Sequence, residues 1–226
     1  MNKFKSANEE ISMKILVFAP HNDDEILGVG GTIRKYIKES HDVYVCEITS
    51  GARKELLQSE ARSAHNLLGI KESIFLNIPV GTVSKMDQFE LNNKINDVVT
   101  RIRPDIVFLP FTGDMHMDHG AVAESAMVSL RPIGDYSVRE IYMYETLSET
   151  GWNFPTSEKS FTPNTWIDIT DTIDEKISAM KCYKSQILQY PHPRSIESII
   201  ALAQYRGATV GVEYAESFVL VRKVIR

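Results

Sequence analysis

Short apolar runs alternate with helical patterns along this chain, and that alternation most constrains the fold. Apolar runs at residues 14–19, 42–49, 73–76 and 105–109 predict strands. Apolar side chains at helical spacing predict helices at 25–39, 53–68 and 89–102. Short connections join these elements, which favours a parallel sheet covered by helices on both faces. We therefore expect the α/β fold class, as a three-layer sandwich with a mostly parallel sheet.

The second half of the chain continues with both kinds of element. Runs at 140–145, 165–169 and 216–222 predict strands, and patterns at 171–183 and 195–205 predict helices. A further helix is expected to begin near His119. Gly69 and Pro104 mark two helix ends. Since no repeat or linker interrupts the chain, we expect one domain over 13–226, preceded by a flexible arm over 1–12.

Composition narrows the class of protein. The formal net charge of −5 disfavours a nucleic acid or an anionic membrane as partner. The two cysteines, Cys46 and Cys182, make no disulfide framework. The first residues lack the apolar core of a secretory signal, and no apolar run approaches the roughly 18 residues of a membrane span. We expect a cytoplasmic protein without a membrane span.

Two clusters of titratable side chains directly follow strands of the predicted sheet. The first spans residues 21–25 (His-Asn-Asp-Asp-Glu), and the second spans residues 114–119 (Asp-Met-His-Met-Asp-His). Parallel strands end at one edge of a sheet, so both clusters should meet there. Unpaired buried carboxylates are costly, which argues against a purely structural concentration of such groups. The joint pattern predicts a metal site.

The chemistry of these side chains suits one Zn²⁺ ion per chain. His21, Asp24 and His119 offer two nitrogens and one oxygen, a typical catalytic set with a position left for water. Asp23 is then free to act as the general base of amide hydrolysis. His116 is placed to face a substrate carbonyl, and Asp118 to hold its ring in one tautomer. Fe²⁺ remains an alternative ion, because two histidines and a carboxylate also bind iron in oxygenases.

Other interpretations of these motifs stay open. Asp24 and Glu25 also favour a helix N-terminus. The glycines Gly28, Gly30 and Gly31 invite a dinucleotide-binding interpretation, but the third glycine of that motif falls at Ile33. Close packing of the first helix on the sheet explains the glycines better. The alternatives to a hydrolase are therefore a non-haem Fe(II) enzyme and a non-catalytic nucleotide- or sugar-binding module.

A family resemblance rests on these same motifs. The run Ala19-Pro-His-Asn-Asp-Asp-Glu25, followed by Gly30-Gly-Thr32, resembles the A-H-P-D-D-E and G-G-T signatures of PIG-L/LmbE-like deacetylases. His116-Met-Asp-His119 resembles their H-x-D-H signature. The resemblance implies a Rossmann-like, LmbE-like domain and a hydrolase that deacetylates an N-acetylated amino sugar or glycoconjugate, such as one containing N-acetylglucosamine. It leaves a homo-oligomer open.

The resemblance also implies roles for single residues. It gives His21, Asp24 and His119 as zinc ligands, Asp23 as the base, and His116 as the residue that stabilises the oxyanion with Asp118 as its partner.

Residues that contact the substrate are less well marked. Asp114 belongs to the second cluster and is a candidate. Leu57 stands where many family members carry arginine, so Arg53 or Arg62 is expected to substitute for it. Arg194 lies in a run that resembles a family motif; it contacts substrate or a neighbouring subunit, or it belongs to a turn capped by Ser195. A further departure is Asn22, where the family usually has proline.

Overall fold

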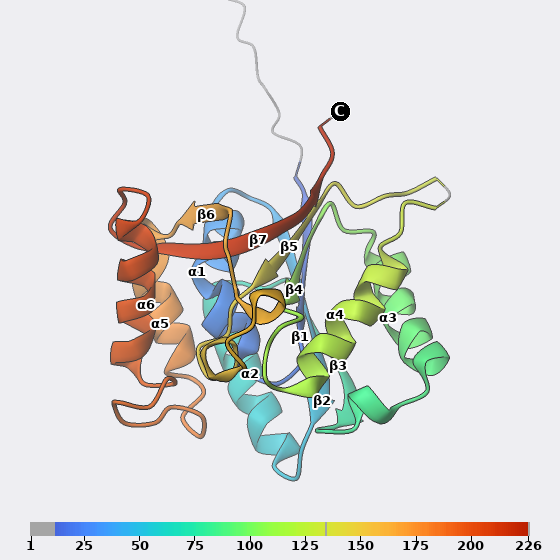
Figure 1. The fold of residues 1–226 in the computed structure, drawn as a ribbon, viewed down its shortest axis with the longest axis horizontal. Helices are drawn as coiled ribbons and strands as arrows, with labels where there is room; N and C mark the ends of the chain where they lie inside the picture. The colour runs from blue at the N-terminus through green and yellow to red at the C-terminus, as the bar shows by residue number, and fades with distance from the viewer. Residues whose placement is uncertain (1–11, 134, 226) are drawn as a thin grey trace, which may run out of the picture.

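A computed structural model describes residues 12–133 and 135–225 as a seven-stranded sheet between two layers of helices (Figure 1). The predicted arm over 1–12 lies outside the described residues except for Ser12. The strand order is β3-β2-β1-β4-β5-β7-β6, and β7 runs antiparallel to both of its neighbours. The predicted three-layer α/β fold is confirmed.

The elements follow the predicted alternation closely. The strands are β1 (Lys14–Ala19), β2 (Asp42–Ser50), β3 (Glu72–Pro79), β4 (Ile106–Pro110), β5 (Glu140–Tyr144), β6 (Thr165–Asp168) and β7 (Ala215–Lys223). The helices are α1 (Asp24–Lys38), α2 (Lys54–Leu68), α3 (Gln88–Ile102), α4 (Met117–Ser129), α5 (Ile173–Met180) and α6 (Ile196–Ala208).

Local chemistry sets several of these boundaries. Gly69 ends α2 with a φ of 89°, and Asp87 caps α3 by accepting a hydrogen bond from the backbone N–H of Glu90. Three predicted elements differ from the structure by three residues at one end. α6 ends at Ala208 rather than at Tyr205, and α5 ends at Met180 rather than at Tyr183. β3 runs three residues beyond the predicted end, to Pro79 rather than Leu76. α5 begins only at Ile173, because residues 170–172 form a 3₁₀ turn in which the Thr172 hydroxyl donates to the Gly31 carbonyl.

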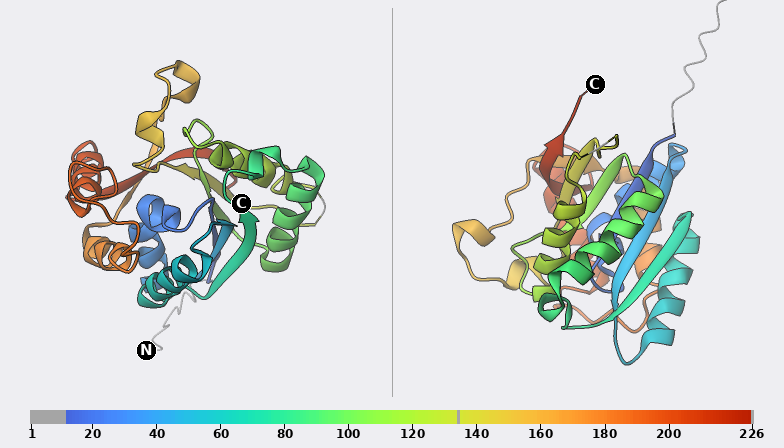
Figure 2. Two further views of the ribbon diagram at one scale, coloured as in Figure 1. Left: turned by 90° about the horizontal axis from the view of Figure 1, so that it is seen from below. Right: turned by 90° about the vertical axis from the view of Figure 1, so that its right-hand side faces the viewer.

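The two faces of the sheet are covered by different helices. Figure 2 shows α1, α2, α5 and α6 on one face and the green helices α3 and α4 on the other. Each layer encloses its own apolar core, and the central strand β1 contributes to both, with Val17 on one side and Phe18 on the other. This double burial explains why β1 is a continuous apolar run.

The order of the strands reverses direction at β1. The chain moves from β1 outward through β2 to β3, and then returns to the other side of β1 with β4. In open α/β sheets a crevice forms at such a switch point, beyond the carboxyl ends of the two strands. The two titratable clusters of the sequence follow β1 and β4, so the topology brings both to this crevice.

Candidate metal and catalytic centre

The loop after β1 is held in an unusual backbone conformation. Asp23, which precedes α1, has a φ of 96°, a left-handed conformation that is rare outside glycine. The backbone N–H of His21 donates to Asp24 Oδ2 at 2.8 Å. Asp23 makes no side-chain hydrogen bond to the start of α1, so its carboxylate is directed elsewhere. Such strain is found at functional sites, where the surroundings enforce it.

Behind this loop lies a buried group of polar side chains. The Asn22 amide donates to Glu47, and the Tyr183 hydroxyl donates to Glu25 Oε1 at 2.6 Å. His65 Nε2 lies 3.2 Å from the same Glu25 oxygen. Glu25, Glu47 and His65 are near enough to one another to share a cation. Both carboxylates already accept hydrogen bonds, however, so this cluster serves to hold the loop, with Asn22 rather than a proline fixing it.

Three donor atoms from the two clusters form a compact triangle. Asp24 Oδ2 lies 3.3 Å from His21 Nδ1 and 3.2 Å from His119 Nε2, and the two ring nitrogens are 3.2 Å apart. Ligands bound to a tetrahedral ion at about 2.1 Å are separated by about 3.4 Å. The triangle therefore has the size of one face of a zinc coordination shell. The structure brings together the three predicted ligands.

His119 is oriented from behind by a second carboxylate. Asp114 Oδ2 lies 2.8 Å from His119 Nδ1, and the Thr150 hydroxyl donates to Asp114 Oδ1 at 2.5 Å. A carboxylate on the outer nitrogen of a histidine ligand fixes its tautomer and directs the inner nitrogen toward the ion. Asp114 is buried behind the ring and does not line the cavity, which gives no support to its predicted contact with substrate.

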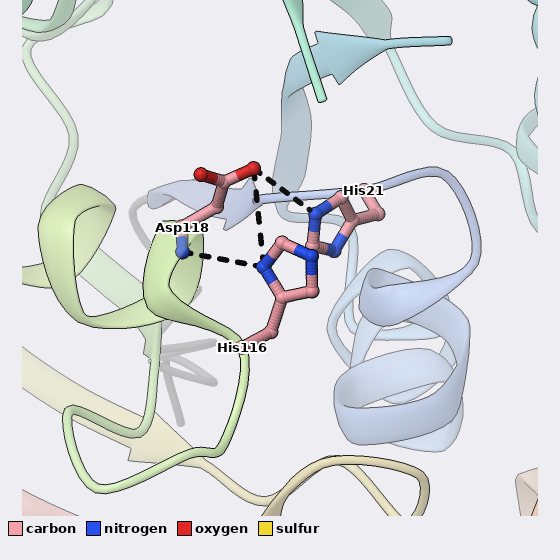
Figure 3. A group of neighbouring side chains, drawn as sticks. All are labelled: His21, His116 and Asp118. Carbon is pink, nitrogen blue, oxygen red and sulfur yellow. Dashed lines mark hydrogen bonds and ion pairs between the residues drawn. The ribbon is translucent and has the colours of Figure 1, made fainter. Parts of the chain in front are cut away.

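The Asp118 carboxylate faces both His21 and His116, whose rings contact each other edge to face with centroids 4.2 Å apart (Figure 3). Its Oδ2 is 3.4 Å from His21 Nε2 and 3.9 Å from His116 Nδ1, and it accepts a hydrogen bond from the Gly81 backbone N–H at 2.7 Å. The backbone N–H of Asp118, not its carboxylate, reaches the His116 ring, donating to Nδ1 at 3.2 Å. The carboxylate thus lies closer to a predicted zinc ligand than to His116, its expected partner.

The Asp23 carboxylate is paired with Arg194. Arg194 Nη1 lies 3.3 Å from Asp23 Oδ2 and donates to Gln186 Oε1 at 2.9 Å. The next residue, Ser195, caps α6 by accepting a hydrogen bond from the Ser198 backbone N–H. Arg194 therefore lies in a capping turn and also makes a long-range contact, so these two interpretations do not exclude each other. Among the described residues, the ion pair of Arg194 is with the predicted base, Asp23.

A cavity of about 250 Å³ opens on this centre. Its lining includes the loop His21–Asp24, together with His116, Arg53, Leu57 and Arg194. Arg53 therefore reaches the cavity. Arg62, the alternative, instead lies over the Phe75 ring, 4.6 Å from its centroid. A second cavity, of about 330 Å³, adjoins the first on the side of Met115 and Met117. Both cavities are lined by His116 and Glu149.

Burial and charge set the proton affinities of the histidines. Burial lowers the pKa of His21, but the carboxylates of Asp118 and Asp24 outweigh it and raise the pKa to about 9. For His119, burial is outweighed by Asp24 and Asp114, which raise the pKa to about 10. Burial and the charge of His21 lower the pKa of His116 below its usual range. Without an ion, His21 and His119 of the triangle therefore bind protons readily, which is typical of side chains arranged around a cation site.

The carboxylates of the loop have opposite tendencies. Burial raises the pKa of Asp23 well above its usual range, and the charge of Asp24 adds to this, while Arg194 opposes it. Burial acts in the same direction on Asp24, but His119 and His21 hold its pKa well below the usual range. Two adjacent carboxylates thus differ strongly in proton affinity. Such a pair is typical of a site where one group binds a cation and the other accepts a proton.

Two residues of the site carried no signal in the sequence. Gln186 follows α5 in an irregular segment, and Glu149 lies in the long connection between β5 and β6. Neither residue belongs to a strand-end cluster or a periodic pattern. They reach the centre because the loops of the second half fold back over the edge where β1 and β4 end.

Comparison with known proteins agrees with this geometry. The model of the PIG-L family, described as GlcNAc-PI de-N-acetylase, matches residues 16–130, which include both clusters. The chain belongs to the PIG-L family. The diacetylchitobiose deacetylase of Thermococcus kodakarensis is 27% identical over 230 residues, covering 90% of this chain and 81% of that protein. The resemblance expected from the motifs is confirmed, and this PIG-L protein is an N-deacetylase.

Solved structures support the same fold assignment. The conserved protein TT1542 from Thermus thermophilus superposes with a TM-score of 0.78 at 28% identity, covering 95% of this chain and 97% of that one. The 4-carboxy-2-hydroxymuconate hydratase GalB from Pseudomonas putida superposes with a TM-score of 0.77 at 20% identity, covering 95% and 98%. At that identity the likeness to GalB shows the fold alone, and the fold serves more than one chemistry.

No helix among residues 12–133 and 135–225 is long and apolar enough to cross a membrane.

Proposed function

We propose that this PIG-L protein is a zinc-dependent hydrolase that removes the acetyl group from an N-acetylated amino sugar or its glycoconjugate. The triangle of His21 Nδ1, Asp24 Oδ2 and His119 Nε2 carries the proposal, because its 3.2–3.3 Å edges suit a small tetrahedral ion. The substrate class is supported by the relative that acts on diacetylchitobiose.

The donor set fits zinc in chemistry as well as in size. Two neutral imidazoles and one carboxylate are a common catalytic zinc set, and Asp114 supplies the outer partner that such a histidine requires. A divalent ion held there would polarise the acetyl carbonyl and make water more acidic. Fe²⁺ suits the same donors, so the choice between the two ions is part of the proposal.

The residues around the triangle then take separate roles. Asp23 accepts a proton from the attacking water, since it lines the cavity and its pKa is raised by burial toward that of an effective base. His116 lines the same cavity, and its Nδ1 accepts the backbone N–H of Asp118. Its Nε2–H is therefore the nitrogen that donates to the developing oxyanion.

The contacts of the remaining candidates define further roles. We assign Asp114 to orienting His119 and Asp118 to orienting His21, on the distances given above. Arg194 holds the base through Asp23 Oδ2, and Arg53 is the cavity-lining cation left for substrate hydroxyl groups.

An amine-release assay with metal-reconstituted protein tests the proposal. N-acetylglucosamine and N,N′-diacetylchitobiose are suitable probes. We expect release of amine and acetate by the wild type, and loss of both metal and activity in His119→Ala. His41→Ala, at the opposite end of the sheet, should retain both. Full metal occupancy in His119→Ala would remove His119 from the ligand set, and turnover that depends on O₂ would favour an iron oxygenase instead.

A further inference from the structure

Glu149 occupies a distinctive position beside the metal triangle. It lies in the connection between β5 and β6, next to Thr150, which supports Asp114. Glu149 lines both the 250 Å³ and the 330 Å³ cavity. His116 is the other residue that lines both cavities. Glu149 and His116 therefore lie where the two cavities adjoin, next to the part of the first cavity that His21 and Asp24 line.

Glu149 is also the acid of the site without an assigned partner. Asp23 pairs with Arg194, Asp24 contacts both ring nitrogens of the triangle, Asp114 holds His119, and Asp118 accepts from Gly81. Among the described residues no hydrogen bond or ion pair engages the Glu149 carboxylate. The Glu149 oxygens are not among the buried atoms without a partner, and Glu149 lines both cavities, so its carboxylate is accessible and free to accept a hydrogen bond from a ligand.

The charges around Glu149 define what that partner is. Burial raises its pKa, the charges of His119 and His21 oppose this, and those of Asp24 and Asp114 add to it. The neighbouring carboxylates would repel an anionic group of a ligand next to Glu149. A neutral N–H donor or a cation from the substrate fits the surroundings better.

Deacetylation produces such a cation at the reacting atom. One water adds its oxygen to the acetyl carbon, the C–N bond breaks, and acetate departs. Both hydrogens of the water end on the nitrogen, which leaves as an ammonium group. A neutral amide N–H thus becomes a positive charge during the reaction. A carboxylate next to the nitrogen stabilises the product more than the substrate, and so also a product-like transition state.

We infer that Glu149 is a further catalytic residue that binds the substrate nitrogen, accepting the amide N–H before cleavage and holding the ammonium afterward. This inference rests on the proposed deacetylation for the identity of the nitrogen. It assigns the amine end of the substrate to the region where the two cavities adjoin. Asp23 and Arg194 line the first cavity only.

Binding of an amine product tests the inference without requiring turnover. The probes are di-glucosamine, which carries the ammonium groups, and N,N′-diacetylchitobiose, its neutral acetylated counterpart. Calorimetric titration of the zinc-reconstituted wild type is compared with Glu149→Gln, which keeps the shape of the side chain and removes its charge. Glu55→Gln, an exposed glutamate on α2 outside both cavities, is the matched control.

We expect Glu149→Gln to weaken the binding of di-glucosamine about tenfold or more, the scale of a hydrogen bond to a charged group. Its metal content and its affinity for the acetylated probe should change little, and Glu55→Gln should match the wild type. Unchanged amine affinity in Glu149→Gln, or an equal loss for both probes, would overturn the role. Absence of amine release by the wild type would instead count against the proposed deacetylation, which the titration does not require.

Discussion

At the scale of single residues, the two adjacent aspartates after β1 make different contacts. Asp24, the first residue of α1, places its carboxylate between two ring nitrogens. Asp23 has left-handed backbone geometry, so its side chain diverges from that of Asp24 and meets Arg194 instead. In the proposed mechanism these two sequence neighbours serve different chemistry, Asp24 as a ligand and Asp23 as a base.

Replacing Asp23 tests this division. Asp23→Asn should keep the metal, because Asp24 is the proposed ligand, and should lower kcat by roughly 10²-fold or more, the scale of losing a general base. Asp97→Asn, an exposed position on α3, serves as the control. Metal analysis and steady-state rates decide the outcome. A metal-free Asp23→Asn protein would show that Asp23 is a ligand.

The histidines predict how metal affinity depends on pH. Without an ion the pKa values of His21 and His119 are raised to about 9 and about 10, so both rings carry protons at pH 7. Binding must displace these protons, and metal affinity should therefore fall as the pH is lowered, by up to about 100-fold per pH unit when two protons are released. Titrations at pH 6, 7 and 8 measure this. A pH-independent affinity would contradict protonation of either ring.

At the scale of elements, α1 is the helix on which the site depends. It carries Asp24 at its first position, and its glycines allow it to lie close to the sheet. A Cβ on Gly28 would stand 2.2 Å from Tyr144 Cδ2, and one on Gly31 would stand 2.8 Å from the Ile169 side chain. The glycines thus serve close packing, as the sequence predicts, rather than a nucleotide phosphate.

Gly28→Ala should therefore destabilise the protein, although alanine is the better helix former. Tyr144 is fully buried and its hydroxyl donates to the Phe18 carbonyl, so its ring cannot move away easily. We expect a loss of about 1–3 kcal/mol in the free energy of unfolding, the usual cost of overpacking. Gly120→Ala, in α4 with its nearest contact at 3.5 Å, should be neutral or stabilising. Urea denaturation compares the two, and equal stability would refute the packing argument.

At the scale of the whole molecule, β7, near the end of the chain, contacts α1, near its beginning, through a buried glutamate. It lies between β5 and β6, and from it Glu216 accepts hydrogen bonds from the backbone N–H groups of Gly31 and Thr32 in α1. Lys176 of α5 lies 2.5 Å from Glu216 Oε1 and also donates to the Leu27 carbonyl. One buried ion pair thus joins α1, α5 and β7.

Removing one charge of this ion pair should destabilise the protein more than removing both charges. Glu216→Gln leaves the Lys176 ammonium buried without its counter-charge, so we expect a loss of about 3–5 kcal/mol in the free energy of unfolding. The double variant Lys176→Met, Glu216→Gln should recover part of that loss, because no buried charge remains. Thermal unfolding of both variants measures the difference. A double variant less stable than Glu216→Gln would show that Lys176 contributes chiefly through Leu27.

The sequence alone determined much of this protein. Apolar periodicity predicted the strands and helices, because one buried face or a fully buried strand requires such patterns. The two clusters after β1 and β4 then predicted His21, Asp24 and His119 as ligands, since parallel topology brings strand ends to one edge. The resemblance to PIG-L proteins rested on those clusters and is confirmed by the family match over residues 16–130.

Only the tertiary structure decided which partner each remaining side chain meets. Asp114 lies behind His119, the Asp118 carboxylate lies nearer to His21 than to His116, and Arg194 reaches Asp23 across 171 positions of the chain. Glu149 enters the site from an irregular connection that has no periodic pattern. Strand-end position follows from local pattern and topology, whereas side-chain partners depend on how distant loops pack together, and no local pattern of the sequence specifies that.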